Sequence, residues 1–141
     1  IAADFEASRT ATWKLFMHHQ PIWSAATAHG SSLLLQQAWM PLVDQYQLDL
    51  VLNGHDHDYE ISKPLINGVV QGSNATATVY VVGGGGGAEL YDTGSLFHTE
   101  YSEKTHSAAV VRVGRNALDL DAIRPDGTPI SAPGARFSKT K

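Results

Sequence analysis

The chain has 141 residues, of which 43% are hydrophobic and 17% are charged, a composition typical of a globular domain with a core of its own. The formal net charge is −4 and the sequence has no basic cluster, which disfavours nucleic acid or an anionic membrane as a partner. No apolar run approaches the ~20 residues of a membrane span. Because cysteine is absent, any metal must be bound through nitrogen and oxygen ligands.

The first part of the chain predicts a helix followed by a strand. Residues 1–12 begin without a capping residue and read as the tail of a longer amphipathic helix. This suggests that an upstream part of the protein precedes them, with an ordinary frayed terminus as the alternative. The apolar run 13–18 then predicts a strand, which stops before Pro21 because proline forces Gln20 out of the helical conformation.

A helix is expected over residues 33–46. Ser31 or Ser32 can cap its first turn, and the apolar residues that follow are spaced for one helical face. Pro41 lies inside this stretch and would cost about 3 kcal/mol in a helix interior. We therefore expect either a kinked helix or two shorter helices that meet at this proline.

The next apolar strand, residues 48–53, ends in a loop that carries His55 and His57. In extended backbone, residues i and i+2 project to the same side, so both imidazoles could reach one point while Asp56 turns away. Gly54 permits a sharp turn or a close approach to the backbone. A pair of solvent-exposed loop histidines is the alternative, but open α/β sheets bind their ligands at such strand ends, which favours a site.

Two predicted strands thus end in histidine, the first at His18 and the second just before His55. A right-handed crossover through the intervening helix would make the strands parallel and place both sets of histidines at the same edge of the sheet. One histidine at a strand end is more often a hydrogen-bonded core residue than a ligand. Two such ends favour a metal site.

Beyond the histidine loop, short β segments predict a mainly antiparallel half. Gly83–Gly87 reads either as a flexible loop or as a close backbone approach near the site. The polar stretch 94–104 predicts a mobile loop, in which His98 has no evident partner. The expected strands are 59–62, 69–71, 78–82, 107–113 and 117–123, with turns at 115–116 and 125–127.

Several motifs together resemble the last motifs of the calcineurin-like metallophosphoesterases, in their purple acid phosphatase-like branch. They are Phe16-Met17-His18 with Pro21, His29-Gly30-Ser31, and VDQYQLDLVLNGHDHDYE at 43–60, followed more loosely by 80–87, His106 and 126–128. The family's earlier aspartate, Gly-Asp and Asn-His blocks have no counterpart here. The resemblance therefore implies that residues 1–141 are the carboxyl-terminal part of a single catalytic domain whose amino-terminal part is absent.

The implied fold class is α/β (α+β), one half of an αββα sandwich in which parallel strands with a crossover helix precede antiparallel strands. By resemblance, His18 and His55 are ligands of a divalent metal, and His57 is a ligand of a neighbouring, often ferric, ion. His29 is the implied catalytic residue, which contacts phosphate oxygens or protonates the leaving group. Residues Asp56, Asp58 and Glu60 are expected to orient ligands or simply to be solvated.

The implied activity is that of an acid phosphatase-like phosphomonoesterase, in which a hydroxide held by two metal ions, iron with zinc, manganese or iron, attacks a phosphate ester. The alternative within the enzymes is a phosphodiesterase or nucleotidase. The alternative outside the enzymes is a non-catalytic β-rich binding domain with a structural metal. Because acidic bridging ligands lack a motif here, the chain alone is expected to be inactive and to need its amino-terminal segment as a partner. The resemblance favours an extracellular or periplasmic location.

Overall fold

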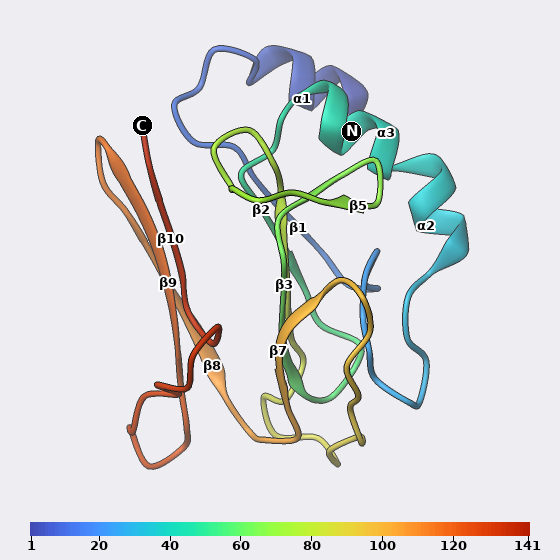
Figure 1. Cartoon of the computed structure of the whole chain (residues 1–141), viewed down its shortest axis with the longest axis vertical. Coiled ribbons are helices and arrows are strands. Elements are labelled where there is room, and N and C mark those ends of the chain that lie inside the picture. Colours follow the sequence, from blue (N-terminus) through green and yellow to red (C-terminus); the bar gives the residue numbers. More distant parts are fainter.

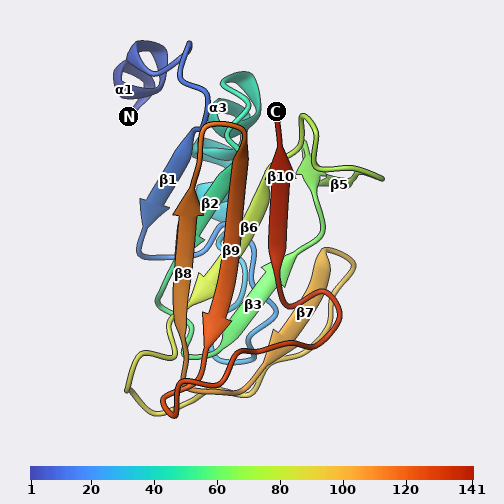
Figure 2. The ribbon, with the colours of Figure 1, turned by 90° about the vertical axis from the view of Figure 1, so that its left-hand side faces the viewer.

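The computed structural model describes residues 1–141 and arranges them in three layers (Figure 1). Short helices cover one face of a central five-stranded sheet, and a three-stranded sheet covers its other face, as Figure 2 shows from the second side. The strand order in the central sheet is β1 (Leu15–His18), β2 (Leu50–Asn53), β6 (Val79–Gly83), β3 (Tyr59–Ser62) and β7 (Thr99–Glu103). The second sheet contains β10 (Phe137–Thr140), β9 (Ala117–Ile123) and β8 (Ala108–Val113). This is the expected α/β class.

The first two strands pair in parallel, as the crossover argument predicts, with Leu15 opposite Leu50 and His18 opposite Asn53. The mainly antiparallel pairing expected after the histidine loop is confirmed, with one exception, because β6 pairs in parallel with β2. Its other neighbour, β3, and the pair β3–β7 are antiparallel. The apolar run of β6 suits this central position, because strands buried on both faces lack polar alternation.

The helical layer consists of three six-residue helices, α1 (Ala2–Ala7), α2 (Leu33–Ala38) and α3 (Met40–Gln45). The side chain of Ser32 caps α2 by accepting a hydrogen bond from the Leu35 amide at 3.4 Å. Pro41 lies in the first turn of α3, where its missing N–H is tolerated, so the alternative of two short helices is confirmed. None of the helices is long enough to cross a bilayer.

Two apolar clusters hold the layers together. Alternate residues of β2 serve both clusters, since Leu50 faces the three-stranded sheet whereas Val51 faces the helices. The larger cluster, between the sheets, buries Leu50, Tyr59, Ile61, Val79, Val81, Leu118, Leu120, Ala122, Ile130, Ala135 and Phe137. The smaller one, beneath the helices, buries Ile22, Val43, Tyr46, Leu48, Val51, Leu65 and Tyr80.

The predicted loop at 94–104 is wrong in its second half, because Thr99–Glu103 forms β7 at the edge of the central sheet. Its polar residues are suited to an edge strand, which keeps one side in solvent. The strand expected at 69–71 is confirmed as β5 (Val69–Val70). Two other strands were not anticipated: β4 (Leu65–Ile66), which pairs with β5, and the carboxyl-terminal β10.

Candidate functional site

The site lies where β1 and β2 end. Because the two strands are parallel and in register, residues 19–32 and 54–58 leave the sheet at the same level. The Gly54 amide donates a hydrogen bond of 3.0 Å to the carbonyl of His19, which joins the two loops at their start. This arrangement brings together histidines that are about 35 residues apart in sequence.

Three imidazoles adjoin one another on these loops. The Nδ1 atom of His55 lies 3.2 Å from Nε2 of His19, and the His55 ring packs against His29 with centroids 4.3 Å apart. Burial lowers the pKa of His55, and the charge of a protonated His29 lowers it further. The backbone of His55 has a φ of +69°, a left-handed conformation that non-glycine residues rarely adopt and that often marks functional loops.

His18 occupies a different environment from His19. As the last residue of β1, it packs against Phe16 and Trp39, with ring centroids 4.6 and 4.7 Å away, and so lies under the helices. The amide of Asn53 lies 3.1 Å from its Nε2 atom. Burial lowers the pKa of His18 to about 4. The structure therefore brings His19, and not His18, into contact with His55.

His57 faces another part of the loop region. Its Nδ1 atom lies 2.7 Å from the Glu89 carbonyl oxygen, and its ring stacks on Tyr91 with centroids 4.3 Å apart. Tyr91 also packs edge-on against His29 at 5.5 Å, so it links the two histidines. The expected extended geometry from His55 to His57 is wrong, because the left-handed φ of His55 rotates the two side chains relative to each other.

The acidic residues of the histidine loop point inward. Asp56, Asp58 and Glu60 are all buried, which excludes simple solvation. Asp56 accepts hydrogen bonds from His29 Nδ1 at 3.0 Å and Ser24 Oγ at 2.7 Å. Burial, together with the charge of Glu60, raises the pKa of Asp58 above its ordinary value.

The glycine segment that follows β6 packs directly beneath this loop. A Cβ atom at Gly84 would lie only 2.0 Å from the Asp56 carbonyl oxygen, and one at Gly85 would lie 2.4 Å from the Thr105 carbonyl oxygen. At Gly86 an added Cβ would meet nothing within 4 Å. Of the two readings of these glycines, close backbone approach is therefore confirmed for Gly84 and Gly85.

We expect Gly84→Ala to lower the free energy of unfolding by at least about 1–3 kcal/mol, because the new methyl group must displace the backbone of Asp56. Gly86→Ala is the matched control and should change it by less than about 0.5 kcal/mol, since its methyl group enters open space. Urea unfolding of the two variants measures both values. Equal stabilities would show that the glycine segment does not support the histidine loop.

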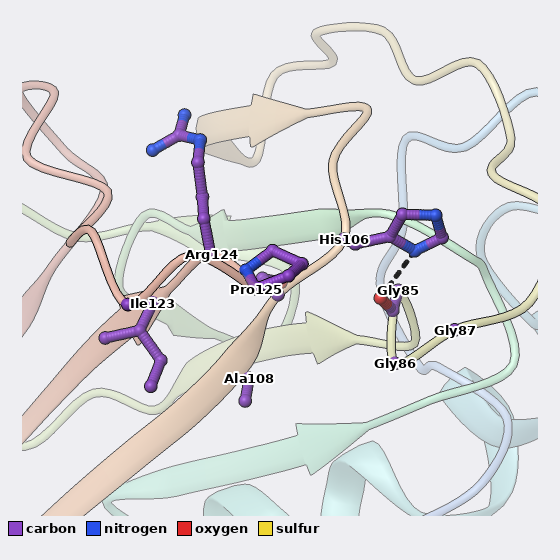
Figure 3. Close-up of a pocket in the computed structure, with 10 residues that line it drawn as sticks. Gly85, Gly86, Gly87, His106, Ala108, Ile123, Arg124 and Pro125 are labelled. Atoms are coloured by element: carbon purple, nitrogen blue, oxygen red, sulfur yellow. Dashed lines mark hydrogen bonds between the residues drawn. The ribbon is translucent and has the colours of Figure 1, made fainter.

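Two cavities flank the loops. The smaller, of about 280 Å³, is lined only by polar residues, glycine and proline, and His29 and His55 are among its walls. Figure 3 shows the larger, of about 580 Å³, between Gly85–Gly87 and the β9 end, where His106 Nδ1 lies 3.1 Å from the Gly85 carbonyl oxygen. Arg124 extends away from the glycines and pairs with Glu103 at 2.7 Å. The smaller cavity is the one that adjoins the histidine cluster.

The donor set fits part of a metal site. Imidazole nitrogens are suitable ligands for iron and zinc, and His19 and His55 already face each other. Nowhere in the chain, however, do three His, Asp or Glu side chains lie where they could hold one ion. These residues could thus contribute ligands to a metal centre, but they do not form a complete one.

Sequence reasoning missed His19 and Tyr91 as members of this site. The signal for His19 was its place directly after the strand, next to His18, and a choice between neighbouring histidines depends on which way each side chain leaves the strand end. Tyr91 lies far along the chain, and no spacing rule connects it with His29 or His57. Only the fold brings it there.

Comparisons with known proteins show what the chain is similar to. Residues 3–59 match the family model of the calcineurin-like phosphoesterases. An uncharacterised protein of Mycobacterium tuberculosis is 38% identical over 96 residues, covering 57% of this chain and 18% of the relative. Acid phosphatase A of Cryphonectria parasitica is 35% identical over 83 residues, covering 56% of this chain and 16% of the relative.

The solved structure of purple acid phosphatase PPD1 from yellow lupin (Lupinus luteus) seeds superposes with a TM-score of 0.81 at 20% identity, covering 99% of this chain and 27% of that one. At this identity the likeness establishes the fold alone. The chain has the fold of a metallophosphoesterase. The resemblance to the calcineurin-like metallophosphoesterases of the purple acid phosphatase-like branch is confirmed, and the chain spans less than a fifth of the length of the curated relatives described above.

Proposed function

We propose that this chain forms the histidine-bearing, carboxyl-terminal part of a phosphoric ester hydrolase, an acid phosphatase-like enzyme that acts on phosphomonoesters. The observation that carries the proposal is the contact of His19, His55 and His29 at the ends of two parallel strands, beside a polar cavity. The family match covers these strands, and an acid phosphatase is among the relatives. The site thus supports phosphate ester chemistry better than a purely structural role.

Two metal ions, iron with zinc, manganese or iron, are the proposed cofactors. When bound, such a pair supplies an activated water and offsets charge on the phosphoryl oxygens. His55 and His57 would be ligands, as the resemblance implies. At the end of β1, His18 was the expected ligand, but His19 is the better candidate because it already contacts His55 while His18 is packed beneath Trp39.

His29 is the proposed acid for the leaving group. Its side chain is 46% exposed and lines the smaller cavity, so its ring can meet a substrate oxygen. Ser31 and Ser32 line the same cavity, and the Ser32 hydroxyl, which accepts a hydrogen bond from the Leu35 amide, keeps its own proton for a phosphate oxygen. A cavity of about 280 Å³ in which Pro21 is the one apolar side chain suits a phosphate group better than a lipid or an aromatic ligand.

A further segment of the protein is proposed to complete the site. Strand β1 lies at an edge of the central sheet. Its side chains Leu15 and Met17 are 38% and 77% exposed, although the faces of parallel sheets are normally covered. A strand paired to this edge would cover both side chains and bring acidic residues to the strand ends, where two cations need anionic ligands. We also propose an extracellular or periplasmic location, on the resemblance alone.

The complete protein, supplied with iron, zinc or manganese, is expected to release phosphate from an aryl monoester and to contain two metal ions by elemental analysis. The purified 141-residue chain should show negligible turnover and weak metal affinity, because it has too few ligands for one ion. Preference for a diester or nucleotide would indicate the phosphodiesterase or nucleotidase reading. A single tightly held zinc without turnover would indicate a structural metal. Sustained turnover by the 141-residue chain would refute the proposal that a further segment is needed to complete the site.

A further inference from the structure

We propose that Asp56 is a positioning residue for His29, and that Ser24 and Glu60 hold Asp56 in place for this task. The inference rests on the proposed function, in which His29 protonates the leaving group. It adds that the orientation of this acid is set by a buried carboxylate on the neighbouring loop. Asp56 itself touches neither substrate nor reacting atoms and acts only through the histidine.

The contact between the two residues is direct. His29 Nδ1 lies 3.0 Å from Asp56 Oδ1, and the carboxylate is completely buried while the imidazole is half exposed. A proton on Nδ1 is therefore donated toward the interior. The other ring nitrogen, Nε2, is the one left free for a ligand in the cavity that His29 lines. A carboxylate bound to one nitrogen of a catalytic histidine fixes both the tautomer and the direction of the ring.

Asp56 is held from its other side. Its Oδ2 atom lies 2.7 Å from Ser24 Oγ, and the same hydroxyl lies 2.7 Å from Glu60 Oε1. Glu60 in turn accepts hydrogen bonds from the amides of Ala25 at 2.7 Å and Ala26 at 3.1 Å. All these groups are buried, and Ser24 Oγ, whose single proton is donated to one of the two carboxylates, is the contact that joins Asp56 to Glu60.

The network connects the two loops that form the site. Ser24 and His29 belong to the loop after β1, whereas Asp56 belongs to the loop after β2 and Glu60 to β3. The carboxylates therefore fasten the backbone of the first loop and the ring that it carries to the histidine loop. These bonds hold the His29 ring on Asp56, the residue that follows His55, and the two imidazole rings pack with centroids 4.3 Å apart.

Asp58 provides a contrast within the same loop. It is as deeply buried as Asp56, but neither of its carboxyl oxygens has a hydrogen-bond partner. A buried carboxylate without partners cannot orient a neighbour through hydrogen bonds. The orienting role therefore belongs to Asp56 specifically and not to the acidic character of the loop.

The first test uses leaving groups of different quality in the complete, metal-loaded protein. For an alkyl phosphate, whose alkoxide leaves poorly, Asp56→Asn should lower kcat about 10–100-fold with little change in KM. For a dinitrophenyl phosphate, which needs no protonation, kcat should change by less than about threefold. Asp92→Asn, an exposed carboxylate paired with Lys104 beside the same loop, is the matched control and should alter neither ester.

A double-mutant cycle separates positioning from a general structural effect. His29→Asn alone should reduce turnover of the alkyl ester, and adding Asp56→Asn to it should cause no further loss, because the two side chains act as one unit. Metal content should be equal in all variants. Additive losses, or an equal loss for both esters, would overturn the proposal.

A second readout does not depend on activity. Nitrogen NMR of the imidazoles in the metal-free complete protein should find the proton of His29 on Nδ1, and Asp56→Asn should move it toward Nε2. A proton already on Nε2 in the unmodified protein would refute the hydrogen bond and the inference. If instead no ester is hydrolysed but Nδ1 carries the proton, the phosphatase proposal fails while the orientation of His29 by Asp56 remains supported.

Discussion

Replacing Asp49 with asparagine is expected to lower the free energy of unfolding by about 3–5 kcal/mol. Asp49 lies just before β2, is 1% exposed, and pairs with Lys139 of β10 at 2.7 Å and with Lys141 at 2.9 Å. The side chain of Lys139 is itself only 3% exposed. The substitution would leave that ammonium group buried without a counter-charge, which costs much more than the net contribution of the intact pair.

The matched control is Asp121→Asn. This aspartate also pairs with two cations, Arg112 and Arg136, but both guanidinium groups are more than half exposed, at 59% and 64%. Solvent can replace the lost partner there, so we expect a change of at most about 1 kcal/mol. Chemical denaturation of both variants under the same conditions measures the difference. Equal effects would show that burial of Lys139 does not govern the cost.

The same ion pair predicts how stability depends on pH. Burial alone would raise the pKa of Asp49, but hydrogen bonds from Lys139, Lys141 and the Lys14 amide lower it below its ordinary value. The folded state therefore binds this proton less readily than the unfolded state, whose pKa is about 3.9. The contribution of the Asp49 ion pair to the free energy of unfolding is present above the unfolded-state pKa. It is lost as the pH falls toward the lower pKa that Asp49 has in the folded state. The stability difference between the unmodified protein and Asp49→Asn should shrink over that acidic interval.

His19→Gln is expected to lower the metal affinity of the complete protein. The loss should exceed the roughly 10–100-fold that is typical when a residue supporting a metal ligand, and not a ligand itself, is removed. The reason is its place: His19 Nε2 already lies 3.2 Å from His55 Nδ1, so the two nitrogens can face a common ion after a small rotation. His18→Gln is the matched control. It should change metal affinity by less than about threefold, because the His18 ring packs against Trp39 and Asn53 and not against the other histidines.

Competition with a chelator, followed by elemental analysis of zinc and iron, compares the two variants directly. If His18→Gln lost its metal while His19→Gln kept it, the assignment drawn from the family resemblance would hold and the structural one would be wrong. Far-ultraviolet circular dichroism should show that both proteins remain folded, since neither residue belongs to the two buried apolar clusters.

The location of the site could be predicted from sequence because it depends on local patterns. Apolar runs before His18 and His55, separated by a helical stretch, were sufficient to expect two parallel strands that end in histidine, and β1 and β2 pair in this way. Pro41 likewise predicted the division of the helix, since proline acts on its own turn. The five consecutive glycines indicated a close backbone approach but not which atoms they approach.

Other features required the tertiary structure, because they depend on atoms that are remote in sequence. The choice between His18 and His19 follows from whether each side chain faces the helices or the adjoining loop, and a strand end does not specify this in advance. Asp56 was expected to turn away, but it is buried against His29 and Ser24 once the left-handed turn at His55 redirects the loop. The polar segment Thr99–Glu103 forms a strand because it pairs with β3, whose other side would be an open edge of the sheet.

Sequence alone therefore determined the class of fold and the strand ends that bear the site, since periodicity and turn residues act over a few positions. Tertiary structure decided which side chains meet there, and it also buried Asp49 with Lys139, some 90 residues away. The physical reason is that burial and hydrogen bonding depend on what packs against a residue. A pattern of neighbours along the chain does not contain that information.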